Sequence, residues 1–169
     1  MKSIVTLTSL VLLTVATACA TEKSAQAGLA LVKAAAVSTT AETVQQKNVR
    51  LVREFYDLAF NAHKPLEAAT KYLAESYIQH NPYVADGRKG FIDAFAGDNN
   101  GVPDISTTDF KRFIAEDDLV VVHSHGKDNP QDRGVAVVDI FRVSGDLITE
   151  HWDVGQKIPE TSKNNNTMF

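Results

Sequence analysis

The strongest constraint on the fold lies in the last third of the sequence, where three segments rich in Val, Ile, Phe and Thr are separated by short polar connections. They are ISTTDFKRFIAEDDLVVVHSHG (105–126), RGVAVVDIFRV (133–143) and DLITEHWDV (146–154). β-Branched and aromatic residues favour strands, whereas Asp, Asn and Gly favour tight turns. We therefore predict about four strands joined as an antiparallel meander.

Helical patterns come before these strands. Residues 41–63 carry apolar side chains on one stripe, which predicts an amphipathic helix of about five turns. A shorter helix is expected after Pro65, in LEAATKYLAE (66–75), and a third in RKGFIDAFAGD (88–98). Helices followed by strands indicate an α+β domain, in which one curved antiparallel sheet wraps over about three N-terminal helices.

Composition limits the partners of this domain. The chain has 169 residues, 44% of them hydrophobic, which suits one domain with a substantial core. Its formal net charge of −4 offers no basic surface for a phosphate backbone, so we expect no nucleic-acid partner. A small molecule or another protein is the expected partner.

The first twenty residues, MKSIVTLTSLVLLTVATACA, resemble a secretory signal peptide, with Lys2 before an apolar run and small residues near a cleavage point after Ala18 or Ala20. Cys19 lies in a loose match to a bacterial lipobox, and an ordinary signal with an incidental cysteine is the alternative. We expect an exported protein, periplasmic or secreted, with membrane attachment only through a lipid at Cys19. A flexible tether (21–41), the domain (42–157) and a polar C-terminal tail (158–169) would follow.

Asp139 is an unusual residue for its place, because it interrupts the apolar run of strand 134–142. Its apolar neighbours would disfavour the charged carboxylate and suit it to a role as a base. If odd-numbered residues pair with odd-numbered ones across the hairpin, Asp139 lies beside His123 or His125. A one-residue change of register would place them on opposite faces. The alternative role for Asp139 is a structural ion pair with Arg142, Arg133 or a histidine.

The segments YIQHNP (77–82), VVDIFRV (137–143) and GDLITEHWDV (145–154) resemble the SnoaL-like proteins, polyketide-cyclase relatives within the nuclear transport factor 2-like superfamily. The resemblance covers about residues 44–169. It implies a cone-shaped fold whose sheet and helices enclose an apolar pocket. It also implies that a strand aspartate, here Asp139, is the acid/base of an intramolecular aldol condensation that needs no metal or organic cofactor. An assisting histidine would be His125 or, as second choice, His123.

Further polar and aromatic residues are candidates for the pocket. They are Tyr77, His80, Phe141, His151, Trp152 and Asp153. His123 and His125, with His80, His151 and Asp139, could instead ligate zinc or another divalent ion, although the resemblance implies no metal. We therefore expect no cofactor.

Two classes of function remain open at this point. In the first, an enzyme uses Asp139 on a small apolar molecule that contains a carbonyl group, by aldol cyclisation, isomerisation or dehydration. In the second, the domain is a non-catalytic ligand-binding or assembly module. Ala136, Val138 and Ile140 make the other sheet face apolar too, which favours a homodimer. Catalysis predicts that Asp139 faces an enclosed pocket near a hydrogen-bond donor; a binding module predicts that an arginine holds it.

Overall fold

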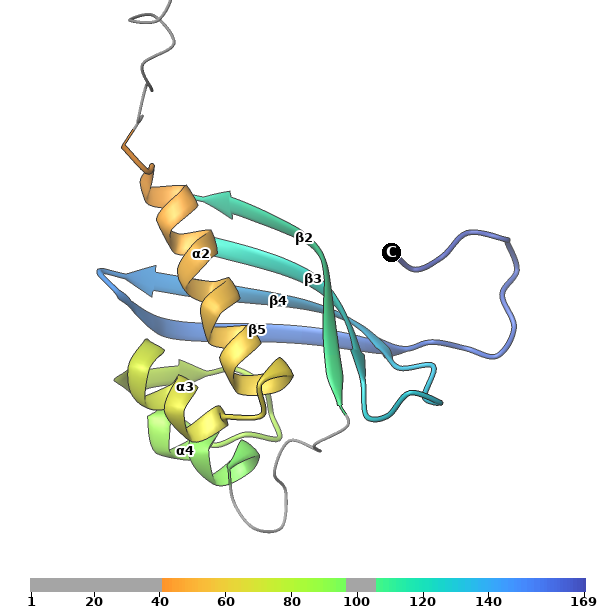
Figure 1. Cartoon of the computed structure of the whole chain (residues 1–169), viewed down its shortest axis with the longest axis horizontal. Coiled ribbons are helices and arrows are strands. Elements are labelled where there is room, and N and C mark those ends of the chain that lie inside the picture. The colour runs from red at the N-terminus through yellow and green to blue at the C-terminus, as the bar shows by residue number, and fades with distance from the viewer. Residues whose placement is uncertain (1–40, 97–105) are drawn as a thin grey trace, which may run out of the picture. The chain divides into compact units, whose positions relative to one another are not determined.

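The computed structural model describes residues 41–96 and 106–169 (Figure 1). The predicted signal peptide, Cys19 and the tether up to residue 40 lie outside the described residues, as does the end of the third predicted helix. Residues Glu42–Phe169 form one compact unit.

The helices begin close to the predicted positions. Helix α2 (Val44–Tyr56) starts with a capping box, in which Thr43 and Gln46 each bond to the other's backbone N–H group. It continues into a π-helical turn, η1 (Asp57–Asn61), where we had predicted regular helix. Helix α3 (Pro65–Tyr72) has its proline in the first turn, and α4 (Gly87–Phe95) follows Asp86.

Strand β1 (Leu73–Gln79) corrects the sequence analysis, which extended the second helix to Glu75 and predicted no strand there. β1 pairs in parallel with the last strand, β5 (Leu147–Lys157), so the sheet is not wholly antiparallel. The segment LAESYIQ contains good helix formers, but in the sheet it buries Leu73 and Tyr77. Tertiary packing has therefore overridden the local helix propensity.

The remaining strands confirm the predicted meander. β2 (Thr107–Glu116), β3 (Leu119–Lys127), β4 (Val135–Ser144) and β5 follow one another as antiparallel neighbours in the sheet order β1-β5-β4-β3-β2. Gly145, whose φ of 61° favours glycine, makes the tight β4–β5 turn. The helices cover one face of the curved sheet, which confirms the α+β cone (Figure 1).

The register of the β3–β4 hairpin differs from the one that we predicted. Asp139 lies opposite Val122, while His123 lies opposite Val138 and His125 opposite Ala136. Even-numbered β3 residues therefore share a face with Asp139, and both histidines lie on the other face. The reason is burial: this register places Val120 and Val122 under the helices, where neither is exposed to solvent.

The core between sheet and helices is largely aromatic. Phe55 of α2 is at its centre and contacts the rings of Tyr56, Tyr72, Phe91 and Phe141, which belong to three helices and to β4. Edge-to-face geometry predominates in these pairs, as is favourable for aromatic rings. The rings fix the helices at a defined height above the sheet.

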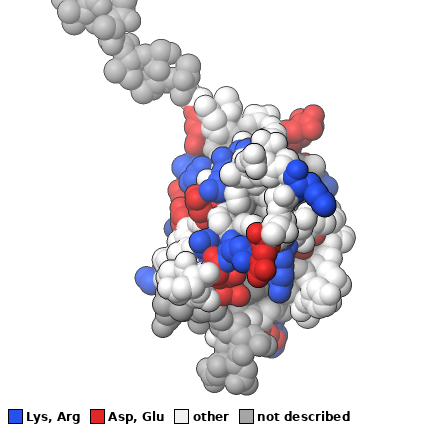
Figure 2. Space-filling view, turned by 90° about the vertical axis from the view of Figure 1, so that its right-hand side faces the viewer, with Lys and Arg blue, Asp and Glu red and all other residues white. Residues whose placement is uncertain are grey.

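The surface carries charges of both signs, as expected for a chain with a formal net charge of −4. On the face displayed in Figure 2, acidic and basic side chains are interspersed. Several charged side chains of the described residues pair with one another, among them Arg50 with Glu42 and Arg142 with Asp118. None of the helices within the described ranges has the length and apolar character needed to cross a membrane.

Candidate active site

A small cavity of about 80 Å³ lies between the sheet and the helices. Ligand pockets commonly measure roughly 300 to 1,000 Å³, so the cavity suits a small molecule or one part of a larger one. Its apolar wall comes mainly from helices and its polar groups mainly from strands. The lining residues are Phe55, Tyr56, Phe60, Tyr77, Gln79, Asn81, Val84, Phe91, Phe95, Asp139, Phe141, His151 and Asp153.

Asp139 and His151 form a buried pair in this cavity. Asp139 is 3% exposed and His151 is 8% exposed. Oδ1 of Asp139 lies 3.1 Å from Nε2 of His151, and the imidazole ring stacks on Phe141 with ring centres 4.7 Å apart. Within the described ranges, Oδ2 of Asp139 is buried and has no hydrogen-bond partner. The hydroxyl of Tyr56 lies near the same carboxylate, so Oδ2 is an acceptor that Tyr56 and a molecule in the cavity can share.

Strand pairing explains why these side chains meet. Asp139 lies opposite Asp153 on β5, and Phe141 lies opposite His151, so all four point toward the helices. β1 adds Gln79, which is paired with His151, and Tyr77 two residues earlier on the same face. Three adjacent strands thus deliver the polar groups of the site.

Gln79 and Asn81 bond to these groups. Nδ1 of His151 lies 2.9 Å from Oε1 of Gln79, which also accepts the backbone N–H of Asn81 at 3.0 Å. Nε2 of Gln79 donates to the hydroxyl oxygen of Tyr77 at 3.2 Å, and Nδ2 of Asn81 donates to Oδ2 of Asp153 at 2.7 Å. The polar side of the cavity is therefore one connected network.

Two tyrosines of the cavity are held in the neutral form. Burial raises the pKa of Tyr56 well above its usual value, and the neighbouring carboxylate of Asp139 adds to the shift. Burial also raises the pKa of Tyr77, against a smaller opposing effect of the hydrogen bond from Gln79. Both phenols therefore remain O–H donors at neutral pH.

His123 and His125 do not reach this site, which corrects their predicted place beside Asp139. Nδ1 of His123 accepts from Arg112 at 2.9 Å, and Nε2 of His125 donates to the carbonyl oxygen of Arg133 at 2.7 Å. The ring of Phe169, the last residue of the chain, stacks on His125 with centres 4.6 Å apart. These histidines belong to the outer face of the sheet.

His80 and Trp152 are also outside the cavity, where we had predicted them to line it. Their rings stack in parallel with centres 4.8 Å apart, and Nε2 of His80 lies 2.9 Å from Oε1 of Glu150. Arg142 joins Glu150 to Asp118, and this guanidinium is the main cause of the lowered pKa of Glu150. The other predicted pocket residues, Tyr77, Phe141, His151 and Asp153, do line the cavity.

The predicted metal ligands are likewise separated, since only Asp139 and His151 of that set come together. With Asp153 they form a different group, whose ligand atoms lie within 4.8 Å of one another. One imidazole and two carboxylates could hold a divalent ion, because Nδ1 of His151 is held by Gln79 and leaves Nε2 for the metal.

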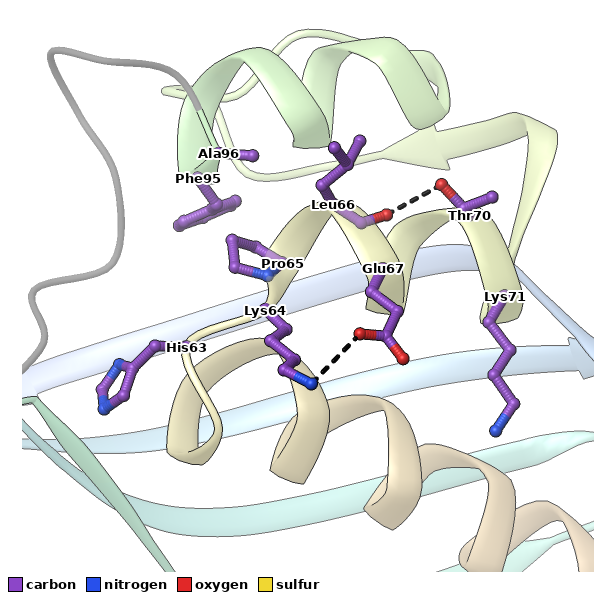
Figure 3. Close-up of a pocket in the computed structure, with 9 residues that line it drawn as sticks. All are labelled: His63, Lys64, Pro65, Leu66, Glu67, Thr70, Lys71, Phe95 and Ala96. Carbon is purple, nitrogen blue, oxygen red and sulfur yellow. Dashed lines mark hydrogen bonds and ion pairs between the residues drawn. The ribbon is translucent and has the colours of Figure 1, made fainter.

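A larger groove, of about 700 Å³, runs along α3 (Figure 3). Its lining residues are His63, Lys64, Pro65, Leu66, Glu67, Thr70, Lys71, Phe95 and Ala96. Their charged groups are exposed, and the labelled side chains show a Lys64–Glu67 ion pair of 3.5 Å and a bond from Thr70 to the Leu66 carbonyl. The smaller cavity, with its buried titratable groups, is therefore the better candidate for a reaction.

The α+β cone that holds these buried polar groups is a fold also found among known proteins. Residues 52–151 match the SnoaL-like domain family, and the chain belongs to that family. No curated protein matches the chain.

Similar solved structures share the fold. TsrD from Streptomyces laurentii is 22% identical, with a TM-score of 0.53 over 67% of this chain and 91% of that one. A proposed ketosteroid isomerase from Kribbella flavida is 17% identical, with a TM-score of 0.57 over 76% and 92%. An NTF-2-like protein of unknown function from Burkholderia xenovorans is 13% identical, with a TM-score of 0.56 over 70% and 89%.

Sequence reasoning missed Gln79, Asn81 and Tyr56. Tyr77, Gln79 and Asn81 alternate along β1 and its end, a spacing that places them on one face of a strand. This alternation indicates a shared face only in a strand, and the sequence analysis predicts no strand for residues 73–79. Tyr56 was overlooked because it lies beside the apolar stripe of α2.

Proposed function

We propose that the protein is a small-molecule enzyme in which Asp139 is the general acid/base for a carbonyl substrate, without a cofactor. The observation that carries this proposal is the buried, unpartnered Oδ2 of Asp139 in the cavity, beside the Oδ1 that faces His151. Membership of the SnoaL-like family agrees with a small-molecule ligand.

The reaction would start at a carbon next to the substrate carbonyl. Oδ2 of Asp139 takes a proton from this carbon, and the electron pair of the C–H bond moves to the carbonyl oxygen to form an enolate. A neutral tyrosine, Tyr77 or Tyr56, donates a hydrogen bond to that oxygen. The enolate carbon then attacks a second carbonyl, as in an aldol condensation, or takes the proton back at another carbon, as in an isomerisation.

The surroundings of Asp139 favour catalysis over a purely binding role. A binding module was expected to hold Asp139 with an arginine, yet its partner in the described ranges is His151. An ion pair with arginine would keep the carboxylate permanently charged, whereas imidazole can exchange a proton with it. This difference supports an acid/base role.

The test is hydrogen exchange at carbon. A panel of small cyclic and aryl ketones is incubated with the protein in D₂O, and loss of the α-proton signals is followed by ¹H NMR. We expect exchange above the buffer rate, and a fall of at least about 10²-fold in Asp139→Asn. Asp128→Asn, at an exposed aspartate, is the matched control and should keep the full rate.

Two outcomes would contradict the proposal. If Asp139→Asn exchanges α-protons as fast as the unchanged chain, Asp139 is not the base. If the unchanged chain binds the ketones without accelerating exchange, the domain is a ligand-binding module. The rate should also survive a chelator; its loss on chelation would instead indicate a metal held by Asp139, His151 and Asp153.

A further inference from the structure

The side chain of Gln79 contacts both His151, which pairs with the proposed base, and Tyr77, the proposed hydrogen-bond donor. Its carbonyl oxygen faces His151, the partner of the base, and its amide nitrogen faces Tyr77, a candidate donor to the enolate. The orientation of this amide therefore decides where two hydrogens of the site lie.

The neighbouring backbone fixes that orientation. The backbone N–H of Asn81 can only donate, and it lies 3.0 Å from the amide atom assigned as Oε1. A flipped amide would set two donors against each other at this point. The carbonyl oxygen of Gln79 is thus the end that faces His151.

This orientation fixes the proton on His151. Because Oε1 of Gln79 can only accept, Nδ1 of His151 must carry a hydrogen. In the neutral ring the lone pair is then on Nε2, which lies 3.1 Å from Oδ1 of Asp139. Two lone pairs at this distance would repel, so one proton is held between Nε2 and Oδ1.

The amide of Gln79 also sets the direction of the O–H bond of Tyr77. The oxygen of Tyr77 accepts the N–H of Gln79 at 3.2 Å, so the phenolic hydrogen points elsewhere. No bond from this hydroxyl to another of the described residues is formed, and Tyr77 lines the cavity. Its hydrogen is therefore left for a ligand oxygen.

We propose that Gln79 is the positioning residue of this site: its carbonyl keeps the hydrogen on Nδ1 of His151, and its N–H group directs the hydroxyl of Tyr77 to the substrate oxygen. This inference deepens the proposed function and rests on it for its role in a reaction. When the shared proton is on Nε2, the carboxylate of Asp139 is anionic and its Oδ2 can act as the base. Once it has taken the substrate proton, the imidazolium remains to offset the charge of the enolate.

The first arm of the test reads the ring of His151 by ¹⁵N NMR of the full chain and needs no substrate. We expect the hydrogen of the neutral ring to be on Nδ1. Gln79→Met removes the acceptor at similar size, and the neutral ring should then shift toward the form protonated on Nε2. Gln79→Glu keeps an acceptor and should keep the hydrogen on Nδ1. Gln45→Met, at an exposed glutamine, is the matched control.

The second arm uses 4-fluorophenol as a stand-in for the enolate, with binding followed by ¹⁹F NMR. Gln79→Glu cannot donate to Tyr77, and Tyr77→Phe lacks the hydroxyl. We expect each to weaken binding about tenfold, the effect of one hydrogen bond, while Tyr77→Phe leaves the His151 signals unchanged.

The inference is overturned if the unchanged chain carries the neutral proton on Nε2 of His151, or if folded Gln79→Met keeps the original ring signals. It also fails if Tyr77→Phe binds the phenol as well as the unchanged chain does. A different result would show that the proposed function fails: α-proton exchange would be absent, while the ring of His151 would still carry its hydrogen on Nδ1. If Gln79→Met does not fold, the unchanged chain and Tyr77→Phe still decide.

Discussion

Asp139, Tyr56 and Tyr77 show how the same burial acts on different groups. A phenol away from water loses little by staying neutral, and a nearby carboxylate makes its ionisation still less favourable. Both effects raise the pKa of the two tyrosines, as described above. The cavity thus keeps two O–H donors at neutral pH.

We predict that Tyr56 and Tyr77 resist alkaline titration while the protein is folded. Because burial raises the pKa of both phenols, they should ionise only as the fold is lost. Since their folded pKa exceeds the unfolded value of about 10, the unfolded state releases protons first, and stability falls as pH rises beyond it.

Absorbance at 295 nm, followed together with circular dichroism, measures this effect. Tyr56→Phe should remove part of the absorbance change that accompanies loss of the circular dichroism signal. If Tyr56→Phe instead removes an absorbance change that occurs before any loss of that signal, the prediction is wrong.

At the scale of elements, the sequence predicted what depends on near neighbours. The stripe of α2 and the alternation of β2 to β5 follow from residues a few positions apart, and both are confirmed. β1 was missed because its partner, β5, lies some seventy positions further along, as the 72-residue separation of Gln79 and His151 illustrates. No local pattern announces such a pairing. Gln79 and Asn81 of the polar network were missed with it.

The start of α2 gives a prediction at this scale. Thr43→Ala removes the side-chain oxygen that accepts the N–H of Gln46, and we expect a loss of about 1 kcal/mol in the free energy of unfolding. Urea denaturation measures it. Gln45 is exposed and lies two residues after Thr43, in the first turn of the helix. Gln45→Ala should change the free energy of unfolding by less than about 0.5 kcal/mol. Equal effects of the two substitutions would rule out a specific role for the capping box.

At the scale of the whole molecule, the register of β3 against β4 determines which side chains lie beside Asp139, and it could not be predicted from the sequence. Both faces of that hairpin are apolar in sequence, so alternation alone could not choose which face meets the helices. Only the packed core does so, by burying Val120 and Val122. The sequence therefore placed His151 only among the pocket residues, and predicted His125 or His123 beside Asp139 where the structure has His151. The predicted homodimer and export remain predictions.

The core itself gives the last prediction. Phe55 is 1% exposed and contacts four other aromatic rings. Phe55→Ala should therefore lower the free energy of unfolding by about 3 to 5 kcal/mol, through lost burial and the space left behind. Tyr83→Ala, at an exposed aromatic residue, is the control and should cost less than about 0.5 kcal/mol. A loss below 1 kcal/mol for Phe55→Ala in chemical denaturation would mean that the cluster does not hold the helices to the sheet.

The lining of the cavity is divided between its two layers: Phe55, Phe60, Phe91 and Phe95 come from helical turns, whereas Asp139, His151 and Asp153 come from strands. Phe60 and Phe95 are only partly buried, so they can vary at less cost to the core than Phe55 or Phe91. Under the proposed function, such changes would alter the shape of the wall, and with it the substrate, while the strand residues kept their part in proton transfer.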